Sequence, residues 1–223
     1  MSGMRRMLAT TALAAATAAV ALTAPAALAA EDGAIVLGAA ISESGKYSTN
    51  GQHTRNGYNL AVERIAEMGG IKVGDKTYNL EIIYYDDEST PARGAQLAER
   101  LINQDGVQFM LGPYSSGLTK AIAPVTEKYK IPMVEGNGAS RSLFTQGYRY
   151  LFAVLSTSEQ DLASSIQLAA EMAQGAGGQP QDVKVAMAFE NDPFSQDVRA
   201  GVIFDAESFG MELVIDDKHA AHR

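Results

Sequence analysis

The chain has 223 residues, of which 46% are hydrophobic and 20% are charged, and it contains neither cysteine nor tryptophan. This composition excludes a disulfide-stapled scaffold, a zinc–thiolate site, a cysteine nucleophile and a disordered tail. The formal net charge is -8 at pH 7, so the surface as a whole repels nucleic acid and anionic membranes. The length is sufficient for one large or two small domains, each with its own core.

The first thirty residues have the pattern of a secretory signal peptide. Arg5 and Arg6 form a positive start, Leu8–Leu22 is apolar and rich in alanine, and Ala27–Ala29 matches a small-x-small cleavage site. We therefore expect residues 1–29 to be removed and the mature chain to reach the periplasm. The arginine pair leaves twin-arginine export open beside the general secretory route. A membrane anchor is the less favoured interpretation, because alanine contributes little transfer energy.

Beyond this segment, short apolar runs alternate with stretches of helical periodicity. In chain order, we predict strand Ile35–Ile41, helix Thr54–Met68, strand Asn79–Tyr85, helix Pro91–Asn103, strand Val107–Leu111, helix Leu118–Lys128 and strand Ile131–Val134. After an extended segment, Tyr148–Leu155, we predict helix Ser158–Gln174, strand Val183–Phe189, helix Pro193–Phe209 and strand Met211–Ile215. Strands joined by helices imply right-handed β-α-β units and mostly parallel sheets. We expect a first lobe over residues 30–150 and a partial second lobe over residues 151–223.

Three polar loops follow strands of the first half of the chain. They are Ser42–Tyr47, Gly112–Gly117 and Glu135–Arg141. In open α/β sheets, ligands bind beyond the carboxyl ends of the strands, where free N–H groups at helix starts can hold an anion. Ordinary helix capping and tight turns would explain any one of these loops. Three of them at the same end of one sheet instead favour a binding site for a small anion.

Signatures of catalysis and of cofactor binding are incomplete. The segment Gly112–Gly117 begins like a phosphate-binding loop, but Leu118 follows where a lysine is required. The segment Gly136–Gly138 begins like a dinucleotide fingerprint but lacks the third glycine. His53 is the one histidine away from the C-terminus, and no serine has the flanking glycines of a nucleophile elbow. We expect no enzyme, no cofactor and no metal, and we interpret Asp86–Glu88 as a solvated strand end, with a Ca²⁺ or Mg²⁺ site as the alternative.

Four segments at the ends of the first-half strands are distinctive in combination: Ile35–Gly51, Tyr84–Pro91, Phe109–Ser116 and Ile131–Ala139. Together they resemble periplasmic substrate-binding proteins of the leucine/isoleucine/valine-binding type, which are receptors of ABC importers. Val183–Asp197 is similar to the family's strand–loop–helix that carries an aromatic residue after an acidic turn. The resemblance implies a two-lobed α/β fold of the type I periplasmic-binding-protein class, with parallel sheets flanked by helices and a cleft that closes by a hinge.

The resemblance also implies which residues bind the ligand. In the family, a serine of the third-strand loop and backbone groups of the fourth-strand loop hold a carboxylate, which by position are Ser116, Asn137 and Ala139. A ring from the first loop covers the ligand, and Tyr47 is the nearest candidate. Phe194 stands where many members have tyrosine. The predicted ligand-binding set is Tyr47, Tyr114, Ser115, Ser116, Asn137, Gly138, Ala139 and Phe194.

The expected function is that of an exported ABC-importer receptor, a monomer that binds a branched-chain amino acid or related small carboxylate and delivers it to a permease in the inner membrane. Family members are usually much longer, and their chain returns to the first lobe. We therefore expect a C-terminally truncated receptor with an incomplete second lobe. Two alternatives stay open: an extracytoplasmic ligand-sensing domain for a signalling partner, and an exported α/β hydrolase, which would need a nucleophile–base pair.

Overall fold

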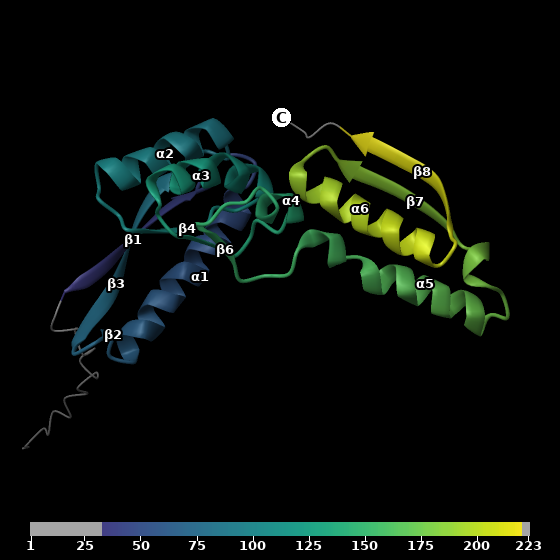
Figure 1. The fold of residues 1–223 in the computed structure, drawn as a ribbon, viewed down its shortest axis with the longest axis horizontal. Helices are drawn as coiled ribbons and strands as arrows, with labels where there is room; N and C mark the ends of the chain where they lie inside the picture. The colour runs from purple at the N-terminus through teal and green to yellow at the C-terminus, as the bar shows by residue number, and fades with distance from the viewer. Residues whose placement is uncertain (1–32, 220–223) are drawn as a thin grey trace, which may run out of the picture.

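The computed structural model describes residues 33–219, so the predicted signal peptide lies outside the described residues. The chain forms two α/β lobes joined by a crossover segment, residues 154–162 (Figure 1). The first lobe is built on a six-stranded sheet and the second on a two-stranded sheet. This confirms the predicted two-lobed α/β architecture. Within the described part of the chain, no helix is both long and apolar enough to cross a membrane.

The sheet of the first lobe has the strand order β2-β3-β1-β4-β5-β6. Its strands are β1 (Ala34–Ile41), β2 (Ile71–Val73), β3 (Lys76–Asp86), β4 (Phe109–Leu111), β5 (Met133–Glu135) and β6 (Leu151–Ala153). All neighbouring pairs are parallel except β2 and β3, which form an antiparallel hairpin. The chain winds from β1 to β3 on one side and then to β4 on the other. The strand order therefore reverses beside β1, and ligands bind at such a switch point.

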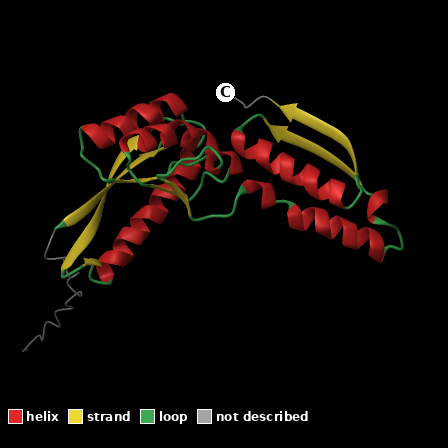
Figure 2. Ribbon diagram, in the orientation of Figure 1, coloured by secondary structure: helices red, strands yellow, loops and turns green. Residues whose placement is uncertain are grey.

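Helices cover both faces of this sheet. They are α1 (Ser48–Glu67), α2 (Pro91–Asn103), α3 (Ser116–Tyr129) and the short α4 (Arg141–Phe144). Figure 2 shows α2 and α3 on one face and α1 on the other. Leu101 of α2 and Ile122 of α3 pack in one buried cluster with Met110 and Met133 of the sheet. Burial of these apolar side chains fixes both helices against the strands, and with them the loops that precede the helices.

The second lobe contains two parallel strands and two helices. They are α5 (Ala163–Gly175), β7 (Lys184–Glu190), α6 (Pro193–Ser208) and β8 (Glu212–His219). Both helices lie on the same side of the strands (Figure 2). Ile166 and Val202 join the two helices in a small buried cluster, whereas Phe204 is 72% exposed and Ile215 is 55% exposed. The apolar surface of this lobe is therefore only partly covered.

Several boundaries differ from the sequence prediction, and the following differences affect the fold most. The helix α1 begins at Ser48 rather than Thr54. The strand β8 continues to His219 rather than ending at Ile215. The predicted helix Ser158–Gln174 is a 3-10 turn at Ser158–Gln160 followed by α5. Within the extended segment Tyr148–Leu155, β6 pairs with β5. Asp216, near the charged end of β8, forms an ion pair with Arg199 of α6.

The early start of α1 depends on Gly51. A Cβ atom at this position would lie 2.0 Å from the carbonyl oxygen of Ser42, at the end of β1. Only a residue without a side chain lets the first turns of α1 pack directly on the backbone of the first loop. The run of small polar residues that looks like a loop in the sequence is therefore a helix in close contact with the sheet edge.

We predict that Gly51→Ala lowers the free energy of unfolding by about 1–3 kcal/mol, because the new Cβ forces backbone atoms apart. Gly57→Ala is the matched control on the same helix, since a Cβ there meets nothing within 4 Å. In the control, alanine's higher helix propensity should raise stability by roughly 0.5–1 kcal/mol. Urea unfolding of both variants checks this, and equal stability of the two would refute the close contact.

Candidate ligand-binding cleft

A cleft of ≈ 270 Å³ lies between the two lobes. The first lobe contributes its loops and the second lobe the start of α6; the lining residues are Tyr47, Tyr114, Ser115, Ser116, Asn137, Glu190, Asp192, Phe194 and Ser195. Six of the eight residues predicted to bind a ligand therefore line one cleft. The other two, Gly138 and Ala139, are buried beside it and do not line it. Their role in binding stays a prediction, as does that of the six.

A second hollow of ≈ 540 Å³ shares two residues with this cleft, Tyr114 and Asn137. Its other walls come mainly from α1 and include His53, Thr54 and Tyr58. Thr54 Oγ1 donates a hydrogen bond of 3.4 Å to Asn137 Oδ1, which joins α1 to the loop after β5. The side chain of Asn137 thus stands between the two hollows, where it can contact a ligand from either.

The first loop, Ser42–Tyr47, is held by acids at the end of β3. Asp86 Oδ1 accepts hydrogen bonds from the backbone N–H groups of Glu43 (3.0 Å) and Ser44 (3.2 Å), and Ser89 Oγ accepts one from the N–H of Tyr47 (3.0 Å). Burial alone would raise the pKa of Asp86, but the hydrogen bonds from the loop lower it below its usual value. The acidic cluster therefore positions the loop that carries Tyr47.

The neighbouring Asp87 is fully buried and accepts a hydrogen bond of 2.6 Å from Ser42 Oγ. Burial raises the pKa of this carboxyl group above its usual value. Within residues 33–219, no group of three or more His, Asp or Glu side chains is arranged to hold a metal ion. The structural role visible for the cluster is therefore to bind the backbone and hydroxyl groups of the first loop.

Aromatic rings and one ion pair form the mouth of the cleft. The rings of Tyr47 and Tyr114 meet edge to face, with centroids 5.4 Å apart. Lys46 Nζ lies 4.6 Å from the centre of the Tyr47 ring and 3.7 Å from Glu190 Oε1 of the second lobe. Both of these side chains are partly exposed, so the ion pair contributes little to stability. It does place an ammonium and a carboxylate group at the edge of the cleft.

The start of α3 brings two hydroxyl groups to the cleft. Ser115 caps the helix, with its Oγ accepting a hydrogen bond of 3.3 Å from the N–H of Leu118. Its φ of 82° is unusual for a residue with a side chain, and such strain is typical of functional loops. Ser116 is almost fully buried, and its Oγ accepts a hydrogen bond of 3.0 Å from the N–H of Ser140. A hydroxyl group that accepts one bond retains its proton, so Ser116 can still donate to an anion.

Glu135, at the end of β5, is a buried acid that the sequence analysis did not single out. Its Oε1 accepts hydrogen bonds from the N–H groups of Asn137 (2.7 Å) and Gly138 (2.8 Å), and its Oε2 accepts one of 2.7 Å from Thr119 Oγ1. A Cβ atom at Gly112 would lie 2.2 Å from Oε2, so glycine at this position leaves room for the carboxyl group. The N–H groups of Asn137 and Gly138 thus already have an acceptor within the protein.

On the opposite wall, Asp192 organises the start of α6. Its carboxylate accepts hydrogen bonds from the N–H groups of Phe194 (2.9 Å) and Ser195 (3.3 Å) and from Ser195 Oγ (2.7 Å). This capping fixes Phe194, a residue that is 37% exposed and lines the cleft. The cleft as a whole combines hydroxyl and amide groups with three aromatic rings, and it has two carboxylates, Glu190 and Asp192, on the second-lobe side. Such a lining suits a small ligand with a polar end and an apolar or flat body.

The chain belongs to the periplasmic binding protein family, whose pattern its sequence matches over residues 34–222. Among curated proteins it is similar to Leu/Ile/Val-binding protein homolog 8 of Brucella abortus, with 28% identity over 157 residues, which is 70% of this chain and 38% of that protein. Homolog 6 of the same species is 36% identical over 78 residues, which is 34% of this chain and 20% of that protein.

Solved structures show the same fold. The branched-chain amino acid transporter substrate-binding protein LivJ of Streptococcus pneumoniae, in complex with isoleucine, has a TM-score of 0.67 at 23% identity, over 85% of this chain and 51% of that one. A solute-binding protein from R. palustris, in complex with 4-hydroxybenzoate, has a TM-score of 0.67 at 28% identity, over 86% of this chain and 47% of that one. This chain thus spans about half the length of these structures.

We predict that Glu135→Gln reduces the dependence of stability on pH. Burial raises the pKa of Glu135 above its usual value of 4.5, although hydrogen bonds from Thr119 and the loop N–H groups act against this shift. Between these two pKa values the folded state binds the proton more tightly, so stability falls as the pH rises through that window. Glutamine can accept hydrogen bonds from the same N–H groups, and its side chain has no proton to lose as the pH rises.

The measurement is urea unfolding of both proteins at pH 4.5, 6 and 8. The stability of Glu135→Gln relative to the parent should increase with pH, and Glu63→Gln, at an exposed position on α1, serves as the control for loss of an acid. If stability changes with pH in the same way for the parent and for Glu135→Gln, the raised pKa of Glu135 is contradicted.

Proposed function

We propose that this chain is the exported receptor of an ABC importer and binds a small carboxylate between its two lobes, without altering it chemically. The candidates are a branched-chain amino acid or a related small carboxylate. Membership in the periplasmic binding protein family supports a binding role. The observation that carries the proposal is the convergence of three loops of the first lobe and the start of α6 on one cleft. Delivery to an inner-membrane permease, a periplasmic location and a monomeric state are parts of the same proposal.

In the proposed complex, the start of α3 binds the ligand's carboxylate. The Ser116 hydroxyl donates to it, and the positive end of this 14-residue helix attracts it. Tyr47 and Tyr114 cover the apolar body of the ligand from the first lobe, and Phe194 covers it from the second. Because the closed cleft excludes water, a charge-assisted hydrogen bond there contributes more than it would on the surface.

Two ligand chemistries fit the relatives. The S. pneumoniae protein was solved with isoleucine and the R. palustris protein with 4-hydroxybenzoate. They differ in the ammonium group that only an amino acid carries. Glu190 lines the cleft from the second lobe, where its carboxylate forms an ion pair of 3.7 Å with Lys46. In the proposed complex with an amino acid, the same carboxylate also pairs with the ligand's ammonium group. The response of binding to a change at Glu190 therefore separates the two classes.

The proposal is tested by isothermal titration calorimetry with leucine, isoleucine, valine, benzoate and 4-hydroxybenzoate. Binding of at least one of these at a 1:1 ratio, with recovery of the unchanged ligand, is the expected outcome. No heat with any of the five, or conversion of a bound compound into a product, would refute it.

For a ligand that binds, we predict that Ser116→Ala weakens affinity by about 1–3 kcal/mol, roughly 5- to 150-fold, because a hydrogen bond to a charged group is lost. Ser208→Ala is the matched control, since its hydroxyl donates to the carbonyl oxygen of Asp205 near the end of α6. The control should bind like the parent. Unchanged affinity of Ser116→Ala in calorimetry would remove this residue from the site.

We also predict that Glu190→Gln weakens binding of an amino acid about tenfold or more and leaves binding of 4-hydroxybenzoate within about twofold, because only the amino acid presents an ammonium group to the lost charge. Calorimetry with isoleucine and 4-hydroxybenzoate measures both. Equal loss for the two compounds would show that Glu190 acts on the cleft as a whole rather than on an ammonium group.

A further inference from the structure

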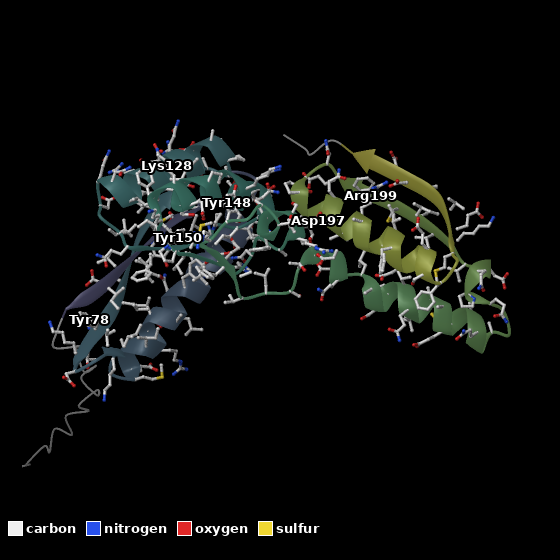
Figure 3. All side chains as sticks on the ribbon, in the orientation of Figure 1. Tyr78, Lys128, Tyr148, Tyr150, Asp197 and Arg199 are labelled. Atoms are coloured by element: carbon white, nitrogen blue, oxygen red, sulfur yellow. The ribbon has the colours of Figure 1, made fainter. Side chains whose placement is uncertain are left out.

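Asp197 of the second lobe makes the best-defined polar contact between the lobes. It lies in the early part of α6, at the junction of the two lobes (Figure 3). Its Oδ2 atom accepts a hydrogen bond of 3.0 Å from the N–H of Ser142 in α4 and a second, short one from Ser140 Oγ. Both donors belong to the first lobe, and both bonds end on the same carboxylate oxygen. The two lobes are therefore joined here by specific hydrogen bonds. We call this contact of Asp197 with Ser140 and Ser142 the clasp.

On the first-lobe side, this contact involves two neighbouring hydroxyl groups, of which Ser140 is buried and Ser142 is partly buried. Ser140 is fully buried, and its Oγ lies 2.7 Å from Ser142 Oγ and 3.2 Å from the carbonyl oxygen of Pro193. The side chain of Ser140 does not cap α4. Instead, the carboxylate of Asp197 accepts a hydrogen bond from the N–H of Ser142. The start of α4 is therefore capped by a side chain of the other lobe.

Ser140 also connects the clasp to the candidate anion site. Its backbone N–H donates the 3.0 Å hydrogen bond that Ser116 Oγ accepts. This hydrogen bond helps to set the orientation of the Ser116 hydroxyl group. A shift of Ser140 therefore also changes the direction in which the Ser116 O–H points. Asp197, Ser140 and Ser116 form one continuous chain of contacts from α6 to the start of α3.

Packing nearby keeps α6 close enough for this contact. A Cβ atom at Gly201 would lie 1.9 Å from the carbonyl oxygen of Glu159, so α6 rests on the backbone of the crossover segment. Within that segment, the N–H of Ser158 donates a 2.8 Å hydrogen bond to the carbonyl oxygen of Ala139, next to Ser140. The crossover and the clasp thus meet at the same turn of the first lobe.

We propose that Asp197 is a positioning residue that fixes the second lobe against the loop after β5 and, through Ser140, orients the Ser116 hydroxyl toward the cleft. The part of this assignment that concerns the ligand rests on the proposed function. The part that concerns the two lobes does not, because the contacts join protein groups only. Loss of Asp197 removes the bonds to both Ser140 and Ser142, so the lobes are held less firmly and Ser140 Oγ keeps only the carbonyl oxygen of Pro193 as an acceptor in the second lobe.

The lobe arrangement can be measured without a ligand. The chain has no cysteine, so Lys120→Cys on α3 and Gln174→Cys on α5, both exposed, place one spin label on each lobe. Pulsed electron paramagnetic resonance then gives the distribution of distances between the labels. We expect Asp197→Ala to broaden this distribution, and Glu207→Gln, an exposed acid on the same helix, to leave it unchanged.

Two further variants separate positioning from a general loss of structure. Asp197→Asn keeps an oxygen that can accept both bonds, so it should restore a distribution close to that of the parent. Ser140→Ala removes one of the two donors on the first lobe and should broaden the distribution less than Asp197→Ala, with no broadening beyond that of Asp197→Ala when the two changes are combined. If Asp197→Ala does not fold by circular dichroism, Ser140→Ala tests the hydroxyl bond alone. A parent-like distribution in the folded variant that lacks the contact would overturn the proposal.

The consequence for binding is measured with isoleucine and 4-hydroxybenzoate. Asp197→Ala should weaken whichever of them the parent binds by roughly 2- to 30-fold, and Asp197→Asn should restore the affinity. If the parent binds neither compound, the ligand class of the proposed function is wrong, while the label distances still decide whether Asp197 holds the lobes.

Discussion

Parallel pairing of the strands around β1 is the constraint on which the rest of the structure depends. Because β1 pairs in parallel with both β3 and β4, and β4 in turn with β5, the loops after β1, β4 and β5 all emerge at one edge of the sheet. Residues far apart in the sequence, such as Tyr47, Ser116 and Asn137, therefore share one cleft. A single antiparallel strand among β1, β4 and β5 would have moved one loop to the opposite edge.

A second feature recurs around the cleft: carboxyl groups bind backbone N–H groups in three of the segments that form it. Asp86 binds N–H groups of the first loop, Glu135 binds those of the loop after β5, and Asp192 binds those at the start of α6. Asp197 then joins the two lobes by the same kind of contact. Part of the acidic composition thus serves to order backbone amides inside the protein. Segments fixed in this way are preorganised, so less conformational freedom is lost when a ligand binds.

Local patterns of buried strands and helix starts were sufficient to predict the alternation of strands and helices. The two-lobed fold and the ligand-binding candidates, six of which line one cleft, came instead from the resemblance to a known family. The sequence was not sufficient for features whose cause lies elsewhere in the chain. The start of α1 depends on the contact of Gly51 with Ser42, and the charged end of β8 depends on Arg199. Glu135 gave no local sign of burial, since glutamate is seldom buried. The partners of Asp197 are 55 and 57 residues away in sequence.

The central claim is that the hydroxyl and amide groups at this one edge bind a small carboxylate against rings from both lobes. A crystal structure of the chain with bound isoleucine or 4-hydroxybenzoate tests it most directly. The account predicts the ligand's carboxylate within hydrogen-bond distance of Ser116 Oγ and its apolar part between Tyr47 and Phe194. A ligand bound away from these residues, or a structure in which Ser116 and Phe194 do not face the same cleft, would contradict it.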